Sequence, residues 1–227
     1  PLRLVGSEMC IRDRFKIEKG ILRKSIYDTQ LVSYEKIKAN SYIIFPYKEV
    51  NGRPVLYSLV EMSTDFPYAL AYLTAYRTKL DQRNMPGRTN ENWFAFGRSQ
   101  SIRRFLSGEH LVWPVLSTSS NYVYDNDMVV FTGGGNGPFY GIEMKTTAQE
   151  SIFYIQAVLN HWLMELLVKS RASTFRGDYY SHGKQFIATL PIYKIDCENP
   201  VEVAKHRQIV EMVQNIMQLL SLIHISE

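Results

Sequence analysis

The sequence predicts an α+β fold in which a mixed or antiparallel sheet is flanked by helices and a further helix ends the fold. Short runs of β-branched and aromatic residues, which are typical of strands, are most frequent before residue 145. Longer runs with helical spacing of apolar residues dominate the remainder. Strands first and helices later is an order typical of α+β domains. A chain of 227 residues, 45% hydrophobic and 21% charged, can bury a core of that kind.

The first clear strand is predicted over Ser41–Tyr47. Asn51 and Gly52 predict a tight hairpin turn, because both tolerate positive φ, and Val55–Val60 is expected to be the return strand. Pro54 suits an edge strand, since proline cannot donate a ladder hydrogen bond.

An amphipathic helix is predicted to begin near Asp65 and to continue past Leu80, followed by a loop over residues 84–92. The segment Ser117–Asp127 carries serine and asparagine turn residues. The other expected elements are strands at Leu111–Leu116, Met128–Phe131 and Phe139–Ile142, a long helix with a buried stripe from Ala148 to Lys169, and a last helix from Val201 to Leu220.

Both ends of the chain resemble translated sequencing adapter. Residues 1–13 and 221–227 are therefore expected to be non-native and are excluded from the predicted fold. Together with the missing initiator methionine, they predict a piece of a longer protein. The expected organisation is one main domain over residues 14–200 and a C-terminal helix over residues 201–220.

Positive charge is clustered along the chain. The net charge is only +4, but residues 71–110 hold seven cations against three acids, and residues 169–184 hold four cations against one acid. Clustered positive charge favours a polyanionic partner.

Two cysteines, Cys10 and Cys197, without CxxC spacing predict neither a zinc site nor a disulfide framework, and fit the cytoplasm. The sequence has no apolar run of about 18 residues, so no membrane partner is expected.

No complete catalytic constellation is found. Phe131–Gly135 matches the F-x-G-x-G pattern of S-adenosylmethionine loops, but a strand-like segment follows it where that loop requires a helix. A glycine-rich hairpin is therefore favoured there. The histidines form no HxxxH pair, and no Gly-x-Ser-x-Gly elbow is present. His161 is expected on a helix surface, and His182 is the one histidine considered for nucleic-acid contact.

Two segments combine aromatic residues, glycines and cations, namely residues 92–100 and 175–186. Arginine matches phosphates and guanine edges, and glutamine can read a base edge. Core packing is favoured for Trp93, Phe94 and Phe96. The predicted DNA contacts are Arg98, Ser99, Gln100, Arg104, Arg176, Tyr180, Lys184 and Gln185. Arg98 and Gln100 are the better base readers, whereas Arg104, Arg176 and Lys184 are expected to hold phosphates.

The order of these motifs resembles the TaqI-like C-terminal specificity domain. That domain is the target recognition domain of adenine-N6 DNA methyltransferases and of fused type IIG restriction-modification enzymes. The resemblance covers about residues 14–220. It is carried by Ile43–Tyr47, Pro67–Leu73, Leu80–Arg83, Trp93–Gln100, Ala157–Asn160, Phe175–Gly177, Gly183–Phe186 and Leu190–Ile192, among others.

The resemblance implies that this chain binds double-stranded DNA in a prokaryotic cytoplasm. A methyltransferase domain, N-terminal in the parent enzyme, would bind S-adenosylmethionine and methylate a flipped adenine. Mg²⁺ would be required if a nuclease domain is fused. Because the Pro-Pro tetrad of that catalytic domain is absent from this sequence, no catalytic, cofactor-binding or metal-binding residue is expected here.

Two alternatives stay open. The chain could be half of a type I restriction specificity subunit, a non-enzymatic DNA-binding protein, although its last helix is short for that role. It could also be a Mg²⁺ nuclease that uses Glu143 and Lys145, which have E-x-K spacing, with Asp125 and Asp127 upstream.

Overall fold

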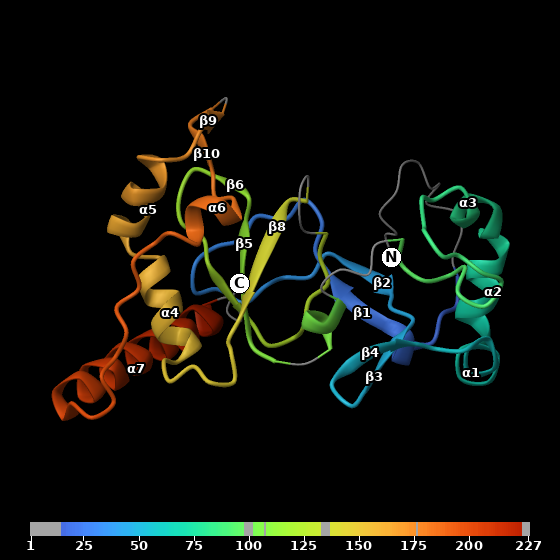
Figure 1. Cartoon of the computed structure of the whole chain (residues 1–227), viewed down its shortest axis with the longest axis horizontal. Coiled ribbons are helices and arrows are strands. Elements are labelled where there is room, and N and C mark those ends of the chain that lie inside the picture. Colours follow the sequence, from blue (N-terminus) through green and yellow to red (C-terminus); the bar gives the residue numbers. More distant parts are fainter. Residues whose placement is uncertain (1–14, 98–101, 107, 133–136, 176, 224–227) are drawn as a thin grey trace. The chain divides into compact units, whose positions relative to one another are not determined.

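The computed structural model describes residues 15–97, 102–106, 108–132, 137–175 and 177–223 (Figure 1). It combines helices with antiparallel sheets and ends in a long helix, which confirms the α+β prediction. The chain divides into two compact units. Unit 1 comprises Pro1–Ile26, Ala39–Ser107 and Met128–Val130, and unit 2 comprises Tyr27–Lys38, Gly108–Asp127 and Phe131–Glu227.

Unit 1 contains two short antiparallel ladders. Strand β1 (Leu22–Ser25), which follows the 3-10 turn η1 (Lys19–Ile21), pairs with β2 (Ser41–Ile44). Strand β3 (Tyr47–Val50) pairs with β4 (Arg53–Leu56). Asn51 and Gly52 join them with φ values of 52° and 72°, which confirms the predicted hairpin.

Helices follow β4 sooner than the sequence suggests. They are α1 (Leu59–Asp65), α2 (Pro67–Ala75) and α3 (Arg77–Asp81), with the 3-10 turn η2 (Ile102–Phe105) further on. The predicted return strand to Val60 is therefore wrong beyond Leu56. The helix predicted from Asp65 past Leu80 is interrupted at Tyr76, whose backbone leaves the helical region at φ −104° and ψ 13°.

Ser58 explains why α1 begins where it does. Its hydroxyl accepts a hydrogen bond from Glu61 N at 3.2 Å, and Glu61 Oε2 accepts one from Ser58 N at 2.8 Å. This reciprocal capping box satisfies amides that the first helical turn leaves open. The hydrogen bonds from Lys48 and Ser58 lower the pKa of Glu61 to about 2.

We expect Ser58→Ala to lower the free energy of unfolding by about 1 kcal/mol, because the cap is lost while nothing is removed from the core. Urea unfolding followed by circular dichroism measures the change. Ser63→Ala, at an exposed serine inside the same helix, is the control and should have a smaller effect. Equal losses in the two variants would contradict the capping role.

The core of unit 1 contains the aromatic residues of the 92–100 segment that the structure describes. Trp93 and Phe94 are each 3% exposed and pack with Met62 and Ala69, while Phe96 packs against a neighbouring cluster around Phe45. The packing role predicted for Trp93, Phe94 and Phe96 is confirmed.

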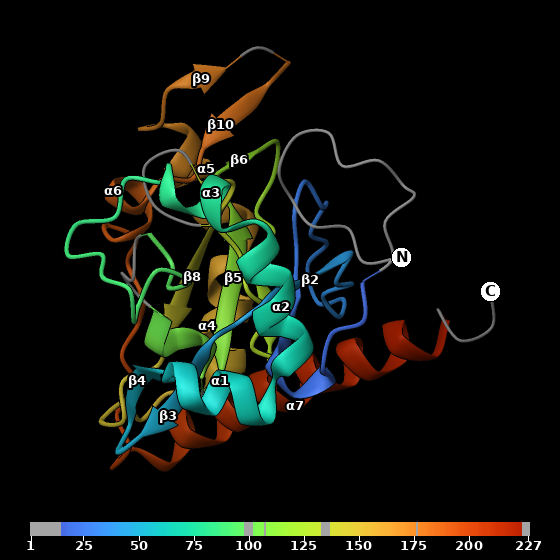
Figure 2. The ribbon, with the colours of Figure 1, turned by 90° about the vertical axis from the view of Figure 1, so that its right-hand side faces the viewer.

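In the residues that the structure describes, unit 2 contains two small sheets and four helices. Figures 1 and 2 show how these elements are arranged. Its main sheet has the order β7-β5-β8, and its second sheet has the order β6-β10-β9. The strands are β5 (His110–Pro114), β6 (Leu116–Ser117), β7 (Val123–Asp125), β8 (Phe139–Glu143), β9 (Thr174–Phe175) and β10 (Tyr179–Ser181). The helices are α4 (Ile152–Leu159), α5 (Trp162–Lys169), α6 (Lys184–Ile187) and α7 (Pro200–Ile223).

One face of the main sheet supplies the core of unit 2. Leu111 and Trp113 on β5 pack with Tyr122 and with Leu159 on α4, all at most 4% exposed. Helix α7 packs against α4, and both views place it at the end of unit 2 away from the β9–β10 hairpin (Figures 1 and 2).

One strand prediction and one turn prediction in this region are wrong. Met128–Phe131 forms only an isolated bridge between Val130 and Ser25, both in unit 1. Strand β7 instead lies inside the segment predicted as a turn, because Val123 and its neighbours pair with β5. Val123 and Tyr124 favour strand structure themselves, whereas the serine and asparagine residues of this segment lie before and after β7.

The predicted helix from Ala148 to Lys169 is two helices, α4 and α5. Asn160 Oδ1 accepts hydrogen bonds from Tyr122 N and Ser33 Oγ, both at 2.9 Å, and its amide donates to Tyr122 O at 2.8 Å. His161 then takes an extended conformation and caps α5 by accepting a hydrogen bond from Leu163 N. His161 is exposed, as expected, but it caps α5 and does not lie inside one continuous helix.

Because of this break, the buried apolar stripe predicted for one continuous helix does not extend along α5. The predicted stripe included Trp162, Leu163 and Leu166, but these residues are 69%, 41% and 54% exposed.

Within the described residues, no helix combines the length and apolar character needed to cross a lipid bilayer.

Candidate nucleic-acid interface

The eight predicted DNA contacts are distributed between the two units. Arg98, Ser99, Gln100 and Arg176 lie outside the described residues. Arg104 lies on η2 of unit 1. Tyr180, Lys184 and Gln185 lie close together in the chain of unit 2, on β10 and at the start of α6. The structure therefore defines a local candidate interface around the last three.

The centre of this interface is the β9–β10 hairpin. Tyr179 pairs with Phe175 and Tyr180 with Thr174, while the other edge of β10 pairs with β6. Gly177 and Asp178, in the connecting turn, have φ values of 78° and 60°. The hairpin stands out from the rest of unit 2 (Figure 1).

Phe175 and Tyr179 are a pair that the sequence reasoning missed. They are cross-strand partners, so their side chains share one face of the hairpin. Phe175 is 50% exposed and Tyr179 is 46% exposed. Period-two alternation on either side of Gly177 and Asp178 could have revealed the pair, because it places these residues on one face and Tyr180 on the other.

The Tyr180 side chain is half-buried, and Lys169 Nζ lies 5.1 Å from the centre of its ring. Cation–π attraction of this kind holds the ammonium group beside the hairpin. Lys184 and Gln185 are exposed. Among the described residues, Lys184 has no acidic ion-pair partner, so its charge is available to a ligand.

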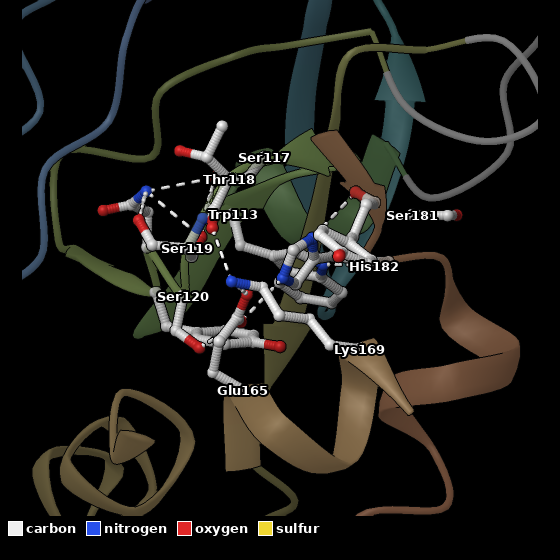
Figure 3. A network of polar contacts seen from close by, with 12 residues as sticks. Trp113, Ser117, Thr118, Ser119, Ser120, Glu165, Lys169, Ser181 and His182 are labelled. Atoms are coloured by element: carbon white, nitrogen blue, oxygen red, sulfur yellow. Dashed lines mark hydrogen bonds and ion pairs between the residues drawn. The ribbon is translucent and has the colours of Figure 1, made fainter. Parts of the chain in front are cut away.

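A polar network anchors the base of the hairpin (Figure 3). Glu165 Oε2 accepts hydrogen bonds from Ser120 Oγ at 2.7 Å and from His182 Nε2 at 2.9 Å. His182 Nδ1 lies 3.1 Å from the carbonyl oxygen of Tyr180. Because both ring nitrogens face acceptors, the ring satisfies both contacts when it carries two protons and Glu165 is ionised.

The same network extends to the chain on either side. Trp113 Nε1 donates to His182 O at 2.9 Å, and His182 N donates to Val115 O at 2.7 Å. Lys169 Nζ donates to Thr118 O at 2.9 Å and lies 3.3 Å from Glu165 Oε1. Figure 3 shows Glu165 and Lys169 reaching from α5 toward His182 and the Ser117–Ser120 segment. These contacts hold His182, the residue that follows β10, against α5 and β5.

Charge balance sets the ionisation of Glu165. Burial alone would raise the pKa of its carboxyl group, but hydrogen bonds from His182 and Ser120 and the positive charges of His182 and Lys169 lower it more. The pKa of Glu165 therefore lies below its ordinary value. His182 is only 1% exposed, so the expectation that it contacts nucleic acid is wrong, and its role is internal.

Several cations of the 71–110 cluster also serve the fold of unit 1. Arg83 donates to Leu80 O and Trp93 O, each at 2.9 Å. Arg77 lies 5.0 Å from the Trp93 ring centre and 3.6 Å from Asp81. These contacts fasten the loop that follows α3 to its helix. Fewer cations of unit 1 are therefore available to a polyanion than the clustering of charge in the sequence suggests.

The residues of the nuclease alternative are placed as follows. Glu143 ends β8 and is exposed, as is Lys145, whereas Asp125 is buried and accepts a hydrogen bond from Asp127 N. Within the described ranges, His, Cys, Asp and Glu side chains form no group of three suited to holding a metal ion. The structure adds no observation in favour of this alternative.

Comparison with known proteins shows a similarity to part of a restriction-modification enzyme. The chain is 26% identical over 198 residues to the type II restriction enzyme and methyltransferase RM.Eco57I of Escherichia coli. The match covers 86% of this chain and 20% of that protein, so the chain spans about a fifth of the relative's length. No family model matches the chain. The chain is thus related to part of a restriction-modification enzyme, while the TaqI-like assignment stays a prediction.

Proposed function

We propose that this chain is a DNA target recognition domain of a restriction-modification enzyme. The observation that carries the proposal is the similarity to RM.Eco57I over 86% of the chain. The exposed aromatic and cationic residues around the β9–β10 hairpin support it, because they suit a polyanion that also has apolar surfaces.

The rest of the proposal concerns the parent enzyme. In it, an N-terminal methyltransferase domain binds S-adenosylmethionine and methylates an adenine, while this domain holds the double-stranded DNA. A nuclease activity in the parent would need Mg²⁺. The setting is the cytoplasm of a prokaryote. Contacts on both sides of the duplex would help to offset the few kcal/mol needed to flip a base.

The test is direct binding of the purified chain to fluorescent duplex DNA over a series of salt concentrations. We expect an affinity that falls steeply and linearly on a log–log plot, because bound phosphates release counterions. A folded chain that shows no salt-sensitive binding to duplex DNA would refute the proposal.

Lys184→Ala is expected to weaken binding evenly across DNA sequences and to reduce the salt slope by about one unit, since one phosphate contact is lost. Fluorescence anisotropy at four or more salt concentrations measures the slope. The matched control is Lys205→Ala, which removes the same charge from an exposed position on α7. A changed site preference with an unaltered slope would mean that Lys184 reads bases and does not hold phosphate.

A further inference from the structure

The aromatic face of the β9–β10 hairpin is the starting point. Phe175 and Tyr179 are both about half exposed, although they lie on an ordered ladder and not in a loop. Hydrophobic and aromatic side chains on such a ladder usually lie over a core. Strand β6 pairs with β10 at Tyr180 and Ser181, so Phe175 and Tyr179 form a small apolar surface on the two-stranded end of the hairpin, beyond that pairing.

The ribbon is suited in size to a groove of DNA. Adjacent strands are spaced about 4.8 Å apart, and the major groove is about 12 Å wide, enough to admit a two-stranded ribbon. The ribbon is also held at its base. His182, the residue that follows β10, is hydrogen-bonded to Glu165 on α5 and to Trp113 on β5. The base of the hairpin is therefore held in place before any ligand binds.

Charge around the base of the hairpin matches the same partner. Lys184 and Arg171 are exposed, whereas Lys169, beside the Tyr180 ring, is already paired with Glu165. One acid, Asp178, lies in the turn. The cations at the base of the hairpin would meet the phosphates at the rim of a groove. The aromatic side chains at its end would meet the base edges on the floor of the groove. In the major groove, the apolar feature of a base edge is the 5-methyl group of thymine.

We infer that the β9–β10 hairpin enters the major groove of duplex DNA and that Phe175 and Tyr179 contact thymine methyl groups there. This inference rests on the proposed function and specifies which element reads bases and by what chemistry. The hairpin contributes sequence preference through apolar contact, while Lys184 and its neighbours contribute affinity that does not depend on sequence.

The experiment uses duplexes that the wild-type chain selects from a randomised 30-base-pair pool. Each selected duplex is compared with a copy in which deoxyuridine replaces thymidine, so that only the 5-methyl groups are lost. We expect the wild-type chain to bind the deoxyuridine copy about 10-fold more weakly. Phe175→Ser with Tyr179→Ser should bind the thymidine duplex about as weakly and no longer distinguish the two.

The salt slope of the double variant should equal that of the wild type, because no charge changes. Trp162→Ser, which removes a 69% exposed aromatic residue from α5 of the same unit, should keep both affinity and discrimination. Circular dichroism confirms that each variant is folded.

The possible failures are distinguishable. Absence of any DNA binding by the wild-type chain would refute the proposed function itself. Binding without a selected sequence, or with discrimination that survives in the double variant, would refute the hairpin's role and leave the proposed function standing.

Discussion

Replacing Glu165 by alanine is expected to lower the free energy of unfolding by about 3 kcal/mol at pH 7, because one partner of a buried pair is removed. Without the carboxylate, the His182 imidazole stays buried with no acceptor for Nε2, and Ser120 and Lys169 lose their shared partner. Unmet hydrogen-bonding groups in the interior cost more than a hydrogen bond contributes.

Urea unfolding followed by circular dichroism measures this loss. The control is Glu198→Ala, which removes an exposed carboxylate from the same unit and should cost less than about 0.5 kcal/mol. Glu165→Gln keeps an acceptor oxygen but not the charge, so its loss should be intermediate. If Glu165→Ala and Glu198→Ala behaved alike, the network would not be the anchor of the hairpin.

The contribution of Glu165 also depends on pH in a defined direction. The folded-state pKa lies below the ordinary value of 4.5, so the ionised carboxylate stabilises the fold above about pH 4.5. That contribution is lost as the pH falls from 4.5 through the lower folded-state pKa. The stability difference between the wild type and Glu165→Gln should therefore shrink as the pH falls below 4.5. A difference that grew on acidification would contradict the sign.

Asn160→Ala is expected to cost about 2 kcal/mol, although alanine is the better helix former. The substitution leaves the buried Tyr122 N–H without its acceptor at 2.9 Å and removes the acceptor of Ser33 Oγ. Tyr122 O keeps the hydrogen bond donated by Gln156 at 3.1 Å, which limits the loss.

Thermal and urea unfolding measure the effect of Asn160→Ala. Asn90→Ala is the control, because it removes an exposed amide whose oxygen accepts from Arg77. A stabilised Asn160→Ala variant would show that the break between α4 and α5 is not held by this amide and that helix propensity decides the conformation there.

Local signals predicted the elements that depend on one or two neighbouring residues. Asn51 and Gly52 favour the turn through their tolerance of positive φ, and both adopt it. Pro67 begins α2, as a proline at the first helical position should. The apolar patterns indicated the α+β class, the packing of Trp93 and Phe94, and a C-terminal helix, which is observed over Pro200–Ile223.

Polar side chains gave weaker guidance, because their roles depend on partners far along the chain. The residues next to His182 in the sequence do not show that it is hydrogen-bonded to Glu165 and Trp113. Likewise, the sequence around Arg83 does not show that its guanidinium donates to the carbonyl oxygens of Leu80 and Trp93. The sequence presents these residues as cations and a histidine beside aromatic groups, and that pattern alone is equally typical of a DNA-binding surface.

What the amino-acid order alone determined is therefore the class of fold and the turn at Asn51 and Gly52, which follow from short-range preferences and composition. Only the tertiary structure decided where the 148–169 helix breaks, which histidine is internal and which aromatic residues stay in water. Those outcomes depend on hydrogen bonds between segments tens of residues apart, such as Asn160 with Tyr122, and on strand pairing that turns Phe175 and Tyr179 to the same face.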